Sequence, residues 1–256
     1  MLIGTSEGER AFIGVRQVAS VVKSIRDEDG FPIFLNADHT HSLAKAEEAA
    51  RAGYDMIGFD GSALAFEENV RQTKEAVEAI KSINADILVE GELGYIGSGS
   101  EIHDTVPESS LIFTRPDEAR QFAEATGVDV VAPAVGNMHG LLAAMVRGEA
   151  RKRLDIGRIA QIKSATDLPL TLHGGSGTDD DDFRRAIEAG ITIVHISTEL
   201  RLAWRRGLQA VLATEPDNLV PYQLFRKADE AIQKVVTERL KLFNQLSSGP
   251  PKPTTL

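Results

Sequence analysis

The sequence contains no cysteine among its 256 residues, and this absence limits the chemistry open to it. Neither a disulfide framework nor a thiolate zinc site can form, so a metal site has to use His, Asp and Glu side chains. Basic residues are also few: 28 Lys and Arg stand against 38 Asp and Glu, which gives a net charge of −10 with no clustered basic stripe. We therefore expect no nucleic-acid surface, and an anionic substrate must be held by local groups.

Long apolar runs are missing as well, since none approaches the ~20 residues that a membrane span requires. The apolar start, residues 1–4, is too short for a signal peptide, so we expect a cytoplasmic protein without membrane contact. A barrel of alternating strands and helices typically reaches about 250 residues as one unit. We predict a single (β/α) barrel domain over residues 1–246 and a disordered tail rich in Pro, Ser and Thr over 247–256.

Apolar runs alternate with helical periodicities along the chain. Strands are predicted over 2–5, 33–37, 55–60, 87–93, 128–135, 168–173 and 191–197. Helices are predicted over 10–26, 42–50, 66–83, 116–125, 155–166, 182–189, 199–213 and 224–246. This alternation indicates an α/β fold, a parallel sheet covered by helices, of the TIM (β/α)8 barrel type. The strand count is one short of the eight that a closed barrel needs.

Three histidines stand where a predicted strand gives way to its loop: His39, His139 and His173. The carboxyl ends of parallel strands in a barrel meet at one face, so the three side chains should open onto the same place. Three neutral imidazoles with an open fourth position are the ligand set of a catalytic zinc. Any one of them alone could be an ordinary polar residue at a strand end. Together they predict a Zn²⁺ site.

A glycine-rich turn follows the last of these histidines, and its backbone amides can face a ligand. The turn and the end of the next strand together match the usual phosphate site of a barrel, where amides and hydroxyls bind an anion. The residues concerned are Gly174, Gly175, Ser176, Ser197 and Thr198. A plain turn is the alternative interpretation. No G-x-G-x-x-G motif opens a helix, which argues against a dinucleotide site, and the turn lacks the last glycine of a serine hydrolase elbow.

Several motifs carry a resemblance to a known family. They are Ala37-Asp38-His39, Asp60-Gly61-Ser62, Glu90-Gly91-Glu92-Leu93-Gly94, His139-Gly140 and Leu172-His173-Gly174-Gly175-Ser176-Gly177. In this order, and over residues 6–243, the chain resembles the class II, metal-dependent ketose-bisphosphate aldolases. The resemblance implies a zinc-dependent aldolase that cleaves or forms a phosphorylated ketose, similar to fructose or tagatose bisphosphate, with dihydroxyacetone phosphate as one product. It also implies a homodimer or homotetramer and, beside Zn²⁺, a monovalent cation.

The residues agree with metal chemistry independently of that resemblance. Breaking a carbon–carbon bond beside a ketone leaves negative charge, which either a Lewis-acid metal or an imine-forming lysine can stabilise. No lysine stands at the end of a predicted strand, where an imine-forming lysine would have to be.

The resemblance also assigns roles to single residues. Asp38 would move the proton of the C4 hydroxyl, and Glu92 would meet the metal in an alternative position. Gly140 would help to hold the cation and the phosphate, and Ser6 would contact substrate. Simpler interpretations are a carboxylate that orients a histidine for Asp38, a salt-bridged carboxylate for Glu92 and a loop cap for Ser6.

The segment 94–110 contains few apolar residues and is predicted to be a mobile lid. In the family a glutamate on this lid handles the proton at the reacting carbon, and Glu101 is the nearest candidate, shifted by one residue.

His195 stands where the family usually has an asparagine that contacts substrate. Because side chains alternate along a strand, it shares a face with Ser197 and should lie inside the barrel. Its ring N–H would then replace the asparagine amide as a donor to a substrate oxygen. A buried histidine bonded to a neighbouring strand is the alternative.

Two other functions fit part of the pattern. A metal-dependent hydrolase on a barrel would use the same three histidines with water as the nucleophile. A shortened barrel that binds sugar phosphates without catalysis is the non-enzymatic alternative, because the chain opens at what resembles the family's second strand. That start also predicts a gap in the sheet beside the strand at 2–5.

Overall fold

The computed structural model describes residues 1–97, 99–106 and 112–245, and the predicted tail lies outside them. Seven parallel strands form one curved sheet in the order β1-β2-β3-β4-β6-β8-β9. They are β1 Leu2–Thr5, β2 Phe34–Thr40, β3 Met56–Phe59, β4 Leu88–Leu93, β6 Val130–Pro133, β8 Leu170–Leu172 and β9 Ile191–Val194. The seven strands predicted from the sequence are confirmed.

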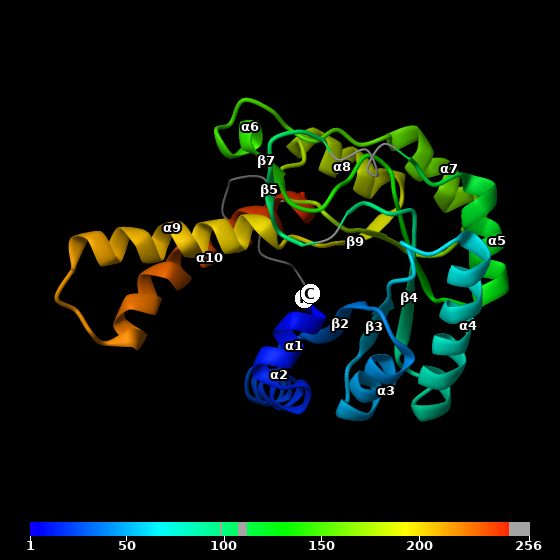
Figure 1. The fold of residues 1–256 in the computed structure, drawn as a ribbon, viewed down its shortest axis with the longest axis horizontal. Helices are drawn as coiled ribbons and strands as arrows, with labels where there is room; N and C mark the ends of the chain where they lie inside the picture. The colour runs from blue at the N-terminus through cyan, green and yellow to red at the C-terminus, as the bar shows by residue number, and fades with distance from the viewer. Residues whose placement is uncertain (98, 107–111, 246–256) are drawn as a thin grey trace, which may run out of the picture.

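Helices follow the strands in turn, and helices such as α4 and α5 cover the outer face of the curve (Figure 1). They are α1 Glu7–Ile13, α2 Val15–Asp29, α3 Leu43–Ala52, α4 Phe66–Ile83, α5 Pro116–Thr126, α6 Ala143–Val146, α7 Ile156–Thr166, α8 Asp180–Ala189, α9 Thr198–Thr214 and α10 Pro221–Phe243. The single helix predicted over 10–26 is wrong, because Gly14 has φ +100° and divides it into α1 and α2. A two-stranded sheet of β5 Ile102–His103 and β7 Leu141–Leu142 was not predicted.

The alternation of side chains along each strand separates the apolar core from the polar inner face. On β4, Val89 faces the helices and is fully buried, whereas Glu90 and Glu92 point to the inside of the curve. Gly91 has no side chain because Phe122 of α5 fills that place: a Cβ there would lie 2.6 Å from the Phe122 ring. The helices therefore pack tightly on one side, and carboxylates collect on the other.

The sheet is an arc, not the closed eight-stranded barrel of the predicted fold type. Within the described residues, β1 and β9 are its two ends and do not pair with each other. The space between them is lined by Leu2 and Ile3 of β1 and by Ile193 of β9, and Leu240 and Phe243 of α10 lie against it. The predicted gap beside the first strand is thus present. Helices α9 and α10 form a hairpin that reaches away from the sheet (Figure 1).

Among the described residues, no helix combines the length and the apolar character needed to cross a membrane.

Candidate active site

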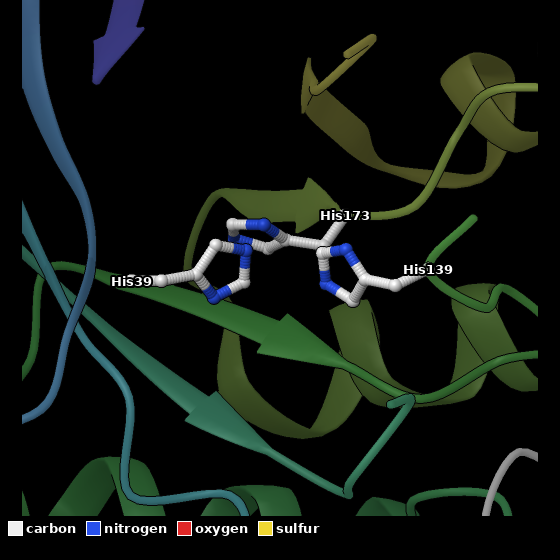
Figure 2. Close-up of side chains that lie close together, drawn as sticks. All are labelled: His39, His139 and His173. Carbon is white, nitrogen blue, oxygen red and sulfur yellow. The ribbon is translucent and has the colours of Figure 1, made fainter. Parts of the chain in front are cut away.

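Three imidazole rings turn toward one another at the carboxyl ends of the strands (Figure 2). His39 comes from β2, His139 from the loop after β6, and His173 from the end of β8. One nitrogen of each ring lies within 4.8 Å of the others, and the His39 ring centroid is 4.7 Å from both partners. The structure therefore brings together the three metal ligands predicted from the sequence.

His39 reaches this position through an irregular turn of backbone. The register of β2 against β3 shifts between Ala37 and Thr40, and His39 has φ +46°, a left-handed conformation rare outside glycine. Arg10, which is 3% exposed, holds the distortion in place. Its guanidinium donates to the carbonyls of Thr5 and Asp38, the latter at 3.0 Å, and to the Thr40 hydroxyl at 3.0 Å. The bulge lets two consecutive residues, Asp38 and His39, both contribute to the site.

Carboxylates surround the ring of His39. Its Nδ1 lies 3.0 Å from Asp60 Oδ2 and 2.8 Å from Glu92 Oε1. Burial works against the charged ring, but Glu92 and Asp60 raise the pKa of His39 to about 12. Burial also raises the pKa of Glu92. Asp60 in addition accepts from the Ser62 amide and hydroxyl, so it both caps a loop and fixes the histidine.

His173 is held by Glu90, a carboxylate whose role its sequence motif did not indicate. Its Nε2 lies 2.7 Å from Glu90 Oε1, and the other Glu90 oxygen accepts from the Thr171 hydroxyl. Burial disfavours the charged ring, yet Glu92 and Glu90 raise the pKa of His173 to about 9. A carboxylate on the far nitrogen is the usual device that orients a metal-binding histidine. Because Glu90 and Glu92 stand two apart on one strand, that spacing could have revealed the role.

His139 is positioned by the loop that carries it. Its amide donates to the Ile96 carbonyl at 3.0 Å, while the neighbouring Asn137 side chain donates to the His173 carbonyl at 3.0 Å. Burial, together with His39 and His173, lowers the pKa of His139 to about 3. The ring of His139 is therefore neutral, whereas His39 and His173, whose pKa values are raised, must each release a proton when a metal binds.

The donor set fits a metal ion on two grounds. Among the described residues, His139 Nε2 and His173 Nδ1 are buried and have no hydrogen-bond partner. Buried polar nitrogens without partners are costly, and a cation at this point would satisfy both. The three imidazoles and the adjacent Glu92 are also ligands that divalent transition metals accept.

Asp38 and His195 form a pair beside the histidines. His195 Nδ1 lies 3.1 Å from Asp38 Oδ1, and its ring centroid is 4.3 Å from that of His173. Burial would raise the pKa of Asp38, but His195, His39 and His173 lower it well below its usual value. Asp38 is thus ionised and can accept a proton. A cavity of about 640 Å³ lies against Asp38, His39, His139 and His195.

The predicted phosphate residues present several unused donors. In the part of the chain that the structure describes, the amides of Gly140, Gly174 and Ser176 donate to no other residue. Ser197 caps α9 and Thr198 is its first residue, where helix amides lack intrahelical partners. Gly175 differs, because its amide donates to the His195 carbonyl at 3.1 Å.

Lys152 lies behind this turn and was not singled out from the sequence. It is 3% exposed, and its Nζ donates to the carbonyls of Met138, Gly140 and Gly174 at 2.6, 2.8 and 2.9 Å. Burial lowers the pKa of Lys152 to about 7, although Glu199 acts in the opposite direction.

Two other predicted residues have different surroundings. Ser6 caps α1: its hydroxyl donates to Glu9 Oε2 at 2.8 Å, although the residue also lines the cavity. Glu101 is exposed just before β5, and its carbonyl accepts from the Leu141 amide at 2.9 Å. The Glu101 carboxylate is not in the group of ligand atoms that His39, His139 and His173 form. Residues 98 and 107–110 of the predicted lid lie outside the described residues, and the lid stays a prediction.

Comparison with known proteins decides the family. A family model described as fructose-bisphosphate aldolase class-II matches residues 1–248. The chain belongs to this family. It is therefore an aldolase, a carbon–carbon lyase, and the family is typically metal-dependent; the cluster of three histidines could bind such an ion.

Individual relatives agree. A fructose-bisphosphate aldolase of Thermus caldophilus is 32% identical over 267 residues, which cover 96% of this chain and 85% of the relative. The crystal structure of the YdjI aldolase of Escherichia coli K12 superposes with a TM-score of 0.77 at 29% identity, covering 94% of this aldolase and 81% of that chain. A fructose-bisphosphate aldolase of Campylobacter jejuni, at 17% identity, shares the fold with a TM-score of 0.73, covering 95% and 82%.

Proposed function

We propose that this aldolase cleaves a phosphorylated ketose, of the fructose- or tagatose-bisphosphate type, and releases dihydroxyacetone phosphate in a zinc-dependent reaction. The observation that carries the proposal is the convergence of His39, His139 and His173 beside an ionised Asp38, next to a cavity that two of the three histidines line. The unused amides of the glycine turn support a phosphorylated substrate.

The metal is proposed as Zn²⁺ because three neutral imidazoles are its usual catalytic ligand set. His39, His139 and His173 would hold it. When bound, such an ion polarises the carbonyl and hydroxyl oxygens of the ketose and stabilises the charge left by bond cleavage. Glu90, through its contact with His173, keeps one ligand in the required orientation.

The chain's own groups handle the protons. Asp38 takes the proton of the C4 hydroxyl; the C3–C4 bond breaks, C4 becomes an aldehyde, and the bonding pair stays with the three-carbon ketone fragment. His195 Nδ1–H donates to Asp38, and its Nε2, which has no partner among the described residues, is placed to accept a hydrogen bond from a substrate hydroxyl. Glu101 is proposed to return a proton to C3, which requires the segment that carries it to move toward the histidines.

The test combines metal analysis with a coupled assay for dihydroxyacetone phosphate. Purified protein should contain about one zinc per chain. It should turn over fructose or tagatose bisphosphate, and lose that activity when a chelator removes the metal. Activity that survives complete removal of metal would contradict the proposal. Release of phosphate without carbon–carbon cleavage would favour the hydrolase alternative.

We also propose that the aldolase is a homodimer or homotetramer. Apolar side chains of α9, α10 and their connection are exposed: Leu219 at 86%, Tyr222 at 75% and Phe225 at 45%. Exposed apolar patches of this kind mark surfaces that associate. Sedimentation velocity at micromolar concentration measures the assembly, and a monomer would contradict the proposal.

A further inference from the structure

The ammonium of Lys152 has the surroundings of a bound monovalent cation. All three of its hydrogen bonds, at 2.6, 2.8 and 2.9 Å, go to main-chain carbonyls, and among the described residues none goes to a carboxylate. Proteins hold K⁺ in this way, with carbonyl oxygens that replace the hydration shell. A lysine without a carboxylate partner is an unusual choice for a position that is 3% exposed.

The three carbonyls belong to the loops of two metal ligands. Met138 and Gly140 flank His139, and Gly174 follows His173. Gly174 has φ +58°, and a Cβ there would collide with the Met138 carbonyl, so the two loops touch at this point. Gly140 and Gly174, whose carbonyls hold the ammonium, are also residues whose amides are unused. In its protonated form, which three donated hydrogen bonds require, Lys152 thus fixes both loops with one positive charge and adjoins the proposed phosphate site.

The backbone of Lys152 is held in place by hydrogen bonds to the residues that end the glycine turn. Its amide donates to the Gly177 carbonyl at 2.8 Å, and its carbonyl accepts from the Asp179 amide at 3.1 Å. These two backbone hydrogen bonds make a parallel β-bridge between Lys152 and Thr178, at the end of the glycine turn. The lysine is therefore tied to the turn at both its backbone and its side chain.

We propose that Lys152 is a built-in cation, which replaces the monovalent ion that the family resemblance implies, so that this aldolase binds phosphate without Na⁺ or K⁺. Lys152 is a positioning residue: it acts on substrate through the two loops. The inference rests on the proposed function only in taking a phosphate ester as the anion. The replacement of the ion can be tested without any turnover.

The experiment compares the parent protein with Lys152→Ala and Lys152→Met, all loaded with zinc. Inorganic phosphate is titrated calorimetrically in tetramethylammonium chloride, and then with K⁺ or NH₄⁺ in its place. The parent should bind phosphate equally in all salts. Lys152→Ala should bind about tenfold more weakly in tetramethylammonium and recover with K⁺ or NH₄⁺, which are small enough to enter the vacated place. Lys152→Met should stay weak, since its side chain fills that place.

Lys163→Ala is the matched control. Lys163 also donates to two main-chain carbonyls, those of Asp167 and Leu168 at 3.0 and 3.1 Å, but its side chain is 35% exposed at the end of α7. This variant should bind phosphate like the parent in every salt. A merely structural lysine would give weak binding in Lys152→Ala that no cation restores, and that result would overturn the proposal.

Thermal melting in the same salts keeps the proposal testable if phosphate binding is absent. The melting temperature of Lys152→Ala should rise with K⁺ and not with tetramethylammonium, whereas that of the parent should respond equally to both. If the parent itself gains phosphate affinity or stability selectively from K⁺, Lys152 does not fill the cation site. Absence of phosphate binding in the parent would count against the proposed substrate, while the melting data would still decide the place of Lys152.

Discussion

Single residues at the strand ends carry most of the chemistry, and one of them has a strained backbone. His39, at φ +46°, holds a conformation that typically costs about 1–3 kcal/mol outside glycine. Arg10 and Asp60 bind on either side of it and maintain the geometry. The strain places a metal ligand and a proton acceptor, Asp38, at consecutive positions in one site.

The metal ligands can be tested one at a time. His39→Ala, His139→Ala and His173→Ala should each lose bound zinc, because two imidazoles hold the ion in poor geometry. His41→Ala is the control: His41 is exposed, and its Nδ1 lies 3.2 Å from the Asp60 carbonyl oxygen and 3.8 Å from Asp60 Oδ2. Metal per chain, measured after dialysis against a weak chelator, should stay near one in the control. Full occupancy in all three ligand variants would refute the site.

Glu90 should matter for metal affinity although it is not proposed as a ligand. Glu90→Gln keeps the shape of the side chain but removes the charge that faces His173 Nε2 at 2.7 Å. We expect zinc affinity to fall by about 10- to 100-fold, the usual effect of losing a partner of a ligand. Competition with a fluorescent chelator measures this. An unchanged affinity would mean that Glu90 only fills space.

His195 should affect both turnover and its pH dependence. His195→Ala should lose most activity yet keep its metal, whereas His195→Asn should keep much activity because an amide can also bond to a substrate oxygen. Asp38 must be ionised to accept a proton, so activity falls as pH drops through the pKa of Asp38. His195 lowers that pKa against burial, so in His195→Ala the acid limb should move to higher pH. If His195→Ala turns over like the parent, His195 is structural.

The sequence was enough to predict those site residues that can be recognised from their immediate neighbours in the chain. His39, His139 and His173 each follow an apolar run, and that pattern alone predicted their convergence. Lys152 could not be found in this way, because it stands in a loop and its three carbonyl partners lie 12 to 22 residues away. The role of Lys152 depends on how two loops pack together, and a local sequence pattern does not show which loops will meet.

At the scale of elements, prediction followed the strength of the periodic signal. Helix α4 was predicted residue for residue over 66–83, since its apolar positions repeat over five turns and buried Ala76 and Ile80 face the sheet. The break at Gly14 and the two-residue strands β5 and β7 were missed. A single glycine inside an amphipathic pattern, or a pair of residues that bond across a loop, gives too little periodicity to recognise.

Asp182 joins α8 to the loop before α7 and should be a major contributor to stability. Its carboxylate is buried and accepts from Arg153 at 2.8 and 3.0 Å and from the Leu154 amide at 2.9 Å. Asp182→Asn should lower the free energy of unfolding by about 1–3 kcal/mol at pH 7. The Arg153 hydrogen bonds lower the pKa of Asp182. This stabilisation is therefore full above the unfolded pKa of about 3.9 and is lost as pH falls through the folded value.

Urea unfolding at pH 7 and in acid checks this, with Asp181→Asn as the control. Asp181 stands next to Asp182 but is exposed and pairs with Arg184 at the surface. Its replacement should change stability by no more than about 0.5 kcal/mol. Equal effects of the two substitutions at pH 7 would show that the buried contacts of Asp182 contribute nothing specific.

For the whole molecule, the open arc gives the sheet two ends, and in the part of the chain that the structure describes side-chain contacts link the elements near them. His195, just after β9, reaches Asp38 on β2 at 3.1 Å, and Arg201 of α9 reaches Glu9 of α1 at 2.7 Å. No strand pairing joins β1 to β9 among the described residues. The same Asp38–His195 contact that prepares the chemistry is thus one of the links that hold the two ends together.

In a closed barrel every strand has two neighbours, whereas an arc must loosen from its ends inward. Amide hydrogens of β1 and β9 should therefore exchange with solvent faster than those of β4 and β6 at the centre. A zinc ion held by ligands on β2, on the loop after β6 and at the end of β8 would connect strands on both sides of that centre. Binding of zinc should therefore slow amide hydrogen exchange at the ends of the sheet as well as near the ligands. Hydrogen–deuterium exchange with and without zinc measures both effects. Uniform protection across all seven strands would mean that the arc opens and closes as one cooperative unit.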